Sequence, residues 1–124
     1  HIHVVEKRDQ PIVTLDTWVK VGSQKETPDN NGVTHFLEHL IFKGTRRHKA
    51  GEADAIIESK GAVFNAATSN DYTHYYITLP SSFFDQALQL HADMLLNAVV
   101  PKDELDRERP VVQEEINRAT DNRQ

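Results

Sequence analysis

Residues 12–21 alternate incompletely between hydrophobic and polar positions, with the odd-numbered face the apolar one, and this pattern predicts a β-strand. Its odd-numbered positions carry valine and leucine with a single threonine, whereas its even-numbered positions include threonine, aspartate and lysine. Since successive side chains of a strand point to opposite faces, we expect one face to be half-buried against helices. The β-branched run at residues 2–6 predicts a neighbouring strand. Residues 62–68 and 72–79 predict two more strands on either side of a polar turn.

Four segments carry the spacing and end signals of helices. Thr34 is the expected N-cap of a helix over residues 34–42. The apolar residues of this segment point in every direction, which predicts a helix buried all round. Residues 52–60 and 82–97 predict the second and third helices, and Pro101 opens a fourth.

Together the elements predict an α+β fold in a single domain over residues 1–124, with a sheet of about four to five strands and helices packed on one face. Composition agrees with a globular domain, since 38% of the residues are hydrophobic and 27% are charged. The net charge of -5 argues against nucleic-acid binding through a basic surface. No segment is apolar enough to predict a membrane span, and without cysteine there are no thiolate ligands or nucleophiles.

Three ionisable side chains share one stripe of the first expected helix. His35, Glu38 and His39 are three or four residues apart, so they project from the same side. Burying two imidazoles and a carboxylate on an otherwise apolar helix is costly unless a partner satisfies them. Two histidines four residues apart can bind Zn²⁺ and leave the glutamate beside a metal-bound water. A buried cluster held only by hydrogen bonds is the alternative.

A catalytic zinc usually has three protein ligands and a water, so a third ligand is expected. The fourth expected helix offers glutamates at positions 104, 108, 114 and 115. With about 100° per residue, Glu108 and Glu115 share the apolar stripe of this helix, whereas Glu114 points toward solvent. Glu115 is therefore the expected inward-facing ligand. A kink at Pro110 would change the direction of Glu108 relative to Glu115.

The segment His35-Phe36-Leu37-Glu38-His39 is the inverted zinc-protease motif H-x-x-E-H. The surrounding sequence extends the match through Val21-Gly22-Ser23, Glu26, Gly32-Val33-Thr34, Lys43-Gly44-Thr45, Phe64-Asn65-Ala66, Thr68, Tyr72-Thr73, Glu108-Arg109 and Glu114-Glu115-Ile116. In these motifs the chain resembles the pitrilysin family of zinc metallopeptidases, the inverzincins, and within it the processing-peptidase-like branch. It departs from that pattern at Gly61-Ala62, where relatives often carry two glycines.

The resemblance implies a zinc metalloendopeptidase. In that family, the positions of His35, His39 and Glu115 are those of the zinc ligands, and the position of Glu38 is that of the general base. The position of Glu108 is that of an acidic residue that supports the ligands.

The resemblance also implies the partners of the site. Asn65 and Ala66 match an edge strand along which family members bind an extended peptide substrate. Family enzymes consist of paired homologous domains that close around this substrate, so a second half-domain or subunit is an expected partner. We therefore expect residues 1–124 to be the N-terminal, zinc-binding portion of a longer enzyme.

The sequence leaves three alternatives to an active peptidase. S-ribosylhomocysteine lyase also has an H-x-x-E-H helix, but its metal site needs a cysteine, which this chain lacks. A non-catalytic relative would commonly lose the motif, which is complete here. A half-module would bind zinc and need its partner domain for activity. The composition and the absence of a leader pattern fit a bacterial cytoplasm or an organelle matrix equally well.

Overall fold

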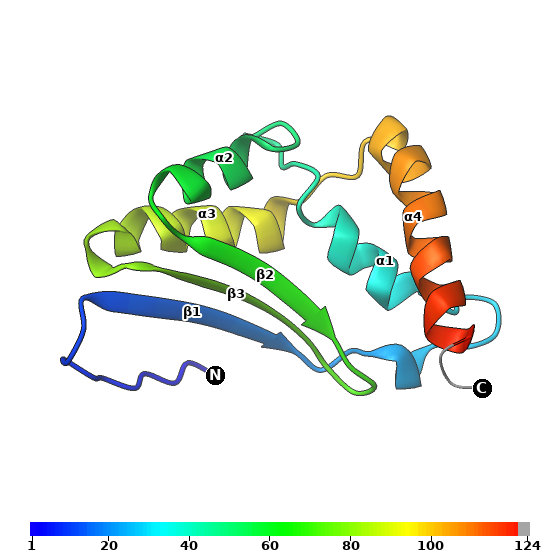
Figure 1. The fold of residues 1–124 in the computed structure, drawn as a ribbon, viewed down its shortest axis with the longest axis horizontal. Helices are drawn as coiled ribbons and strands as arrows, with labels where there is room; N and C mark the ends of the chain where they lie inside the picture. The colour runs from blue at the N-terminus through cyan, green and yellow to red at the C-terminus, as the bar shows by residue number, and fades with distance from the viewer. Residues whose placement is uncertain (122–124) are drawn as a thin grey trace.

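The computed structural model describes residues 1–121, and it confirms an α+β fold. One strand is followed along the chain by two helices, two strands and two further helices (Figure 1). Short 3₁₀ turns follow β1 and β3. The elements are β1 (Ile12–Val19), α1 (Val33–Leu40), α2 (Glu52–Ser59), β2 (Val63–Thr68), β3 (Thr73–Pro80), α3 (Phe84–Asn97) and α4 (Lys102–Asp121).

The three strands form one antiparallel sheet in the order β1-β3-β2. Leu15 of β1 and Phe64 of β2 both lie opposite Ile77 of the central strand. This register places odd-numbered residues of β1 and β3 and even-numbered residues of β2 on one face, which is the more buried face. The sequence alternation therefore produces a sheet with one covered side.

The hydrophobic core lies between this face and helices α2 and α3, which cover it (Figure 1). Ile77 and Met94 are each 1% exposed, and Ile57 of α2 is also buried. Each such side chain stabilises the fold by roughly 1.5–3 kcal/mol relative to full exposure. No helix within residues 1–121 packs on the opposite face, where Trp18 and His74 stack with ring centroids 4.5 Å apart.

The sheet has fewer strands than the four to five expected. Residues 2–6 pair with no strand of the described chain, and Ile2, Val4 and Val5 are almost fully exposed. A β-branched run favours extended backbone, but a strand forms only where a neighbouring edge accepts its hydrogen bonds. The strand predicted at residues 2–6 does not form within the described residues, because no strand edge pairs with it.

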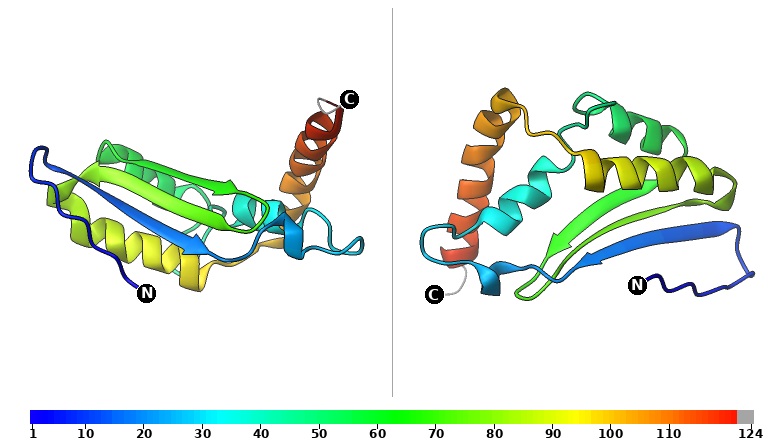
Figure 2. Two further views of the ribbon diagram at one scale, coloured as in Figure 1. Left: turned by 90° about the horizontal axis from the view of Figure 1, so that it is seen from below. Right: turned by 180° about the vertical axis from the view of Figure 1, so that it is seen from behind.

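Helices α1 and α4 pack against each other beyond the end of the sheet, and α4 stands away from the sheet (Figure 2). Val112 of α4 is buried, and α4 continues through Pro110 without interruption. The expectation that α1 is buried all round is wrong for the described chain, because Val33 and Leu37 are 44% and 52% exposed. Within residues 1–121, α4 and β2 are the elements that pack most extensively against the helix. No helix within residues 1–121 has both the length and the apolar composition that a membrane span requires.

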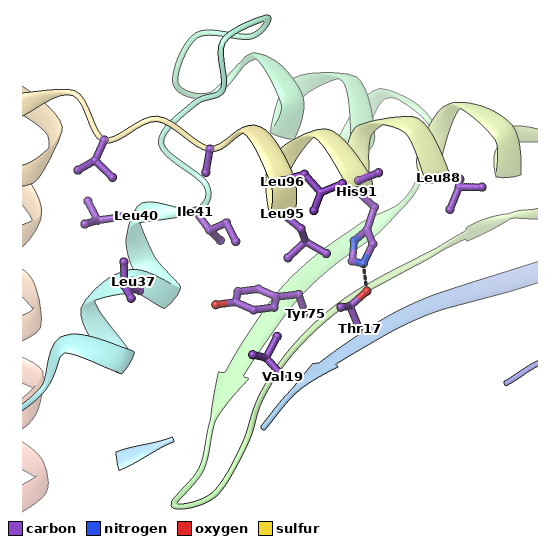
Figure 3. Close-up of a pocket in the computed structure, with 13 residues that line it drawn as sticks. Thr17, Val19, Leu37, Leu40, Ile41, Tyr75, Leu88, His91, Leu95 and Leu96 are labelled. Carbon is purple, nitrogen blue, oxygen red and sulfur yellow. Dashed lines mark hydrogen bonds between the residues drawn. The ribbon is translucent and has the colours of Figure 1, made fainter. Parts of the chain in front are cut away.

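An apolar cleft of about 620 Å³ separates α1 from α3 at the ends of β1 and β3 (Figure 3). Leu37, Leu40 and Ile41 line it from α1 and the residue after it, and His91 lines it from α3. His91 is buried, and its Nε2 lies 2.8 Å from the Thr17 hydroxyl, as expected for a hydrogen-bonded core histidine. Burial lowers the pKa of His91, although the charge of Asp16 opposes this shift. Nδ1 of His91 is buried and has no hydrogen-bond partner among the described residues.

Candidate metal centre

A carboxylate from the preceding loop fixes the start of α1. The N-cap is Gly32, with a φ of 88°, rather than the expected Thr34, which lies inside the helix. Glu26 accepts hydrogen bonds from the backbone N–H groups of Gly32 and Thr34, both at 2.7 Å. These bonds satisfy donors that the helix itself leaves unpaired. Burial raises the pKa of Glu26, but the two hydrogen bonds outweigh it, so the pKa lies below its usual value.

Helices α1 and α4 bring three side chains together at their contact. Nε2 of His35 and Nε2 of His39 are 3.3 Å apart. Oε2 of Glu115 lies 3.2 Å from the first of these nitrogens and 3.3 Å from the second. All three side chains are partly accessible, so the group opens to solvent on one side. The two helices thus present three ligand atoms at the corners of a nearly equilateral triangle.

The size of this triangle fits a tetrahedral ion. Zinc bonds of about 2.0–2.1 Å to nitrogen and oxygen place the ligand atoms of a tetrahedral site about 3.3–3.4 Å apart. The observed separations of 3.2 to 3.3 Å match that spacing. A set of two histidines and one carboxylate is also a known catalytic zinc ligand set, with a fourth position left for water.

The other ring nitrogen of His39 strengthens this fit. Nδ1 of His39 lies 3.0 Å from Oε2 of Glu108, and Nζ of Lys43 lies 2.6 Å from Oε1 of the same carboxylate. Burial raises the pKa of Glu108, but the hydrogen bonds from Lys43 and His39 lower it to a value below the usual one. An ionised Glu108 is an acceptor for a proton on Nδ1 of His39, and a ring that donates through Nδ1 offers the lone pair of Nε2 to a metal ion. Nε2 of His39 and Oε2 of Glu115 lie 3.3 Å apart, so one cation could bind to both atoms.

Glu38 lies beside the triangle in the same groove. The groove has a volume of about 790 Å³ and is lined by His35, Glu38, Glu115, Ala66 and Thr68, with further residues of the loops at its ends. The hydroxyl of Thr68 donates a hydrogen bond to Oε2 of Glu38. The carboxylate is thus held by β2, while the two histidines of α1 face α4. This arrangement offers an anchored proton acceptor next to the three candidate ligands.

The two expected substrate-binding residues differ in their position relative to the groove. Ala66 lines the groove, whereas Asn65 belongs to the opposite face of the strand and lies outside the groove. The backbone N–H of Ala66 donates to Oδ1 of Asn65 at 2.8 Å. β2 is an outer strand of the described sheet, so one of its edges has no strand partner within residues 1–121.

Sequence analysis assigned no role to Lys43 or Thr68, although both contact the expected site residues. Lys43 follows His39 by four residues, so helical spacing would have placed it on the side that faces Glu108. Thr68 follows Ala66 by two residues, so strand alternation would have placed both on the face toward the groove. The helical spacing and the strand alternation predict these contacts only when it is known that α4 faces Lys43 and that α1 faces Thr68.

Comparison with known proteins places this fold and motif in a family. Residues 2–124 match the family described as Insulinase (Peptidase family M16). The chain belongs to this family of peptidases, which confirms the resemblance to pitrilysin-type enzymes.

Relatives within the family include proteins named as proteases and proteins named as subunits of the cytochrome b-c1 complex. The chain is 42% identical over 111 residues to zinc protease PqqE of Helicobacter pylori, covering 90% of this chain and 25% of that protein. It is 37% identical to human mitochondrial-processing peptidase subunit beta and 37% identical to human cytochrome b-c1 complex subunit 1, each covering 90% of this chain and 23% of the relative. The crystal structure of a protease from Helicobacter pylori superposes with a TM-score of 0.85 at 41% identity, covering 91% of this chain and 27% of that one. The chain thus spans about a quarter of the length of the relatives it matches.

Proposed function

We propose that this chain is the metal-binding part of a zinc metalloendopeptidase. The observation that carries the proposal is the spacing of His35, His39 and Glu115, whose ligand atoms lie 3.2 to 3.3 Å apart beside the Glu38 carboxylate. When bound there, Zn²⁺ would polarise the carbonyl of a peptide bond and lower the pKa of a water to about 7.

The other steps of the proposed reaction are assigned to side chains of the chain. Glu38 accepts the proton of the attacking water and passes it to the leaving amine, and Thr68 keeps its carboxylate in place. Glu108 holds His39 in the tautomer that presents Nε2 to the metal, and Lys43 keeps Glu108 ionised. His35, His39 and Glu115 supply the ligand atoms.

The substrate in this proposal is an extended peptide that pairs with the outer edge of β2. Ala66 and Thr68 bring this strand to the groove that holds Glu38, so a paired peptide would pass the candidate metal site. Backbone pairing tolerates many side chains, which suits an endopeptidase with broad sequence tolerance. Asn65 would act through the backbone of Ala66 rather than by facing the groove.

We further propose that activity requires a second homologous half-domain or subunit. The chain corresponds to about a quarter of the length of its relatives. A groove that is open to solvent does not exclude bulk water from the reacting groups, whereas closure of a second domain over it would. The chain alone is then expected to bind zinc without rapid hydrolysis.

Metal content of the purified chain tests the proposal. We expect about one zinc per chain by elemental mass spectrometry and its loss in His39→Ala, because that substitution removes one of the three ligand atoms. Addition of the remaining part of the protein should then produce hydrolysis of an unstructured peptide that a chelator abolishes. Absence of zinc from the unaltered, folded chain would contradict the assignment.

A second candidate is a family member that binds zinc or keeps the fold without hydrolysing peptides. The observation that favours it is the 37% identity to a protein named as a subunit of the cytochrome b-c1 complex rather than as a protease. The two candidates differ in one result. Zinc binding without hydrolysis after addition of the remaining protein would favour the non-catalytic relative.

A further inference from the structure

A buried carboxylate outside the metal centre joins three parts of the chain. Asp93 of α3 is 5% exposed. Its Oδ2 accepts a hydrogen bond from the hydroxyl of Thr45 at 2.6 Å and lies 3.2 Å from Nδ1 of His48. Its Oδ1 accepts a hydrogen bond from Nδ2 of Asn97 at 2.8 Å. We call Thr45, His48, Asp93 and Asn97 the Asp93 clamp.

Thr45 connects this carboxylate to the loop that follows α1. Its hydroxyl donates to Asp93 and accepts hydrogen bonds from the backbone N–H groups of Arg47 and His48, both at 3.0 Å. The side chain thus uses its single proton and both lone pairs. Thr45 is 7% exposed, so water does not compete strongly for these contacts. The Thr45 hydroxyl therefore links the loop over residues 44–48 to α3.

The same loop is bonded to the segment that leads into α4. Gly44 accepts a hydrogen bond from the backbone N–H of Val99, and Arg46 donates one to the carbonyl of Asn97. Thr45 and Ala98 form an isolated antiparallel bridge. In Figure 1 the segment from α3 to α4 runs beside the end of α1, in agreement with these bonds. The clamp and these backbone bonds together connect the C-terminal end of α1 with the approach to α4.

This connection bears on the metal centre because the ligands come from both helices. His35 and His39 belong to α1, whereas Glu115 and its neighbour Glu108 belong to α4. Lys43, which contacts Glu108, lies between α1 and the clamp. A metal site holds its ion well only when its ligands are within about 0.5 Å of the required positions. Any change in the separation of α1 and α4 would alter the triangle of ligand atoms.

We propose that the Asp93 clamp is a positioning device for the metal centre, with Asp93 and Thr45 setting the separation of α1 and α4. This inference rests on the proposed function, since it requires that the centre bind a metal. A buried carboxylate costs free energy unless its oxygens are satisfied, and apolar residues of similar size would cover α3 without that cost. The directional bonds of Asp93 fix the loop in one place, which packing alone does not require.

The test compares Thr45→Val with Thr45→Ser. Valine keeps the shape of threonine and removes its three hydrogen bonds, whereas serine keeps the hydroxyl. We expect zinc affinity, measured by competition with a chromophoric chelator, to fall about 10–100-fold in Thr45→Val and to stay near the original value in Thr45→Ser. The visible absorption of bound Co²⁺ should change in Thr45→Val only, because it reports ligand geometry.

Two further variants separate positioning from stability. Ile57→Val weakens the core on α2 away from the clamp, and it should lower the melting temperature without changing zinc affinity. Asn97→Ala removes a single bond to Asp93 and should weaken zinc binding in the same direction by a smaller factor, which keeps the test available if Thr45→Val does not fold. If the unaltered chain binds zinc and the folded clamp variants bind it with unchanged affinity, the positioning role of the clamp is contradicted and the proposed function is not. No zinc binding by the unaltered chain would overturn the proposed function and the clamp together.

Discussion

The two sides of α1 differ in chemistry although they are built from the same eight residues. One side carries His35, Glu38 and His39 toward α4 and β2, and the other carries Leu37 and Leu40 toward the apolar cleft (Figure 3). The helical repeat alone separates them, because Leu37 lies nearly half a turn away from either histidine. A short helix can thus supply reactive groups on one side while the other side contributes to the hydrophobic packing.

The two sides of α1 interact electrostatically through one residue of the sheet. Tyr75 of β3 lines the apolar cleft, and its hydroxyl is directed toward α1 in Figure 3. Burial raises the pKa of Tyr75, and the negative charge of Glu38 raises it further. The charge of Glu38 on the polar side of α1 therefore shifts the pKa of Tyr75 on the apolar side. Substitutions can test how far the two sides remain independent.

The largest effect is expected from Glu38→Gln on the polar side. Loss of the proton acceptor should lower the rate of peptide hydrolysis by about 10²–10⁴-fold in the protein with its partner domain, while zinc content stays unchanged. Leu37→Ala, on the opposite side of the same turn, is the matched control and should retain hydrolysis. Comparable losses in both variants would show that the two sides do not act separately.

A stability change is expected from the apolar side. Leu40 is 3% exposed, so Leu40→Ala should lower the free energy of unfolding by about 2–5 kcal/mol in urea titrations. Leu37→Ala should cost clearly less, since that side chain is 52% exposed. Equal costs for the two leucines would indicate that the cleft is closed over Leu37 in solution.

A smaller effect is expected when the support of His39 is weakened. Glu108→Gln keeps the size of the side chain but removes the charge that fixes the ring of His39. Zinc affinity should fall by about 10–100-fold in a chelator competition assay. Glu114→Gln, on the exposed side of α4 and paired with Arg118, is the control that should leave affinity unchanged.

The smallest effect concerns the start of α1 and depends on pH. Glu26→Gln should lower the free energy of unfolding at pH 7 by about 0.5–2 kcal/mol, as for the loss of a helix cap. The pKa of Glu26 is lowered in the folded chain, so the unfolded chain binds its proton first as pH falls. The stabilisation is therefore complete above the ordinary glutamate pKa of about 4.3 and is lost as pH falls through the lower folded value. Urea titrations at pH 7 and pH 3 should show this loss in the original chain and a weaker pH dependence in Glu26→Gln.

Sequence alone predicted the features that depend on the local periodicity of helices and strands. The spacing of His35 and His39 fixes their common side once the segment is helical, and the alternation in β1 and β3 fixes the buried face of the sheet. The bounds of α2 and β2 follow from local glycine and turn signals in the same way. Glu115 was predicted from the phase of its own helix, and the match to family motifs supported that choice.

Features that depend on distant parts of the chain were not predicted. Thr45 and Asp93 are 48 residues apart, and nothing near either residue indicates the other. The strand expected at residues 2–6 failed for the related reason that its partner edge cannot be read from local propensity. The cap of α1 is likewise a carboxylate from Glu26, six residues before Gly32, rather than the adjacent Thr34.

The aromatic stack on the uncovered face of the sheet gives the protein a built-in optical probe. Trp18 is the single tryptophan of the chain, and it contacts the rings of Tyr72 and His74, with centroids 4.6 and 4.5 Å away. Because Trp18 pairs with His74 across β1 and β3, its fluorescence depends on the integrity of that strand pair. The sheet separates it from the side that faces α1. Emission should therefore follow unfolding while remaining constant during zinc titration, so a single chromophore distinguishes loss of the metal from loss of the fold.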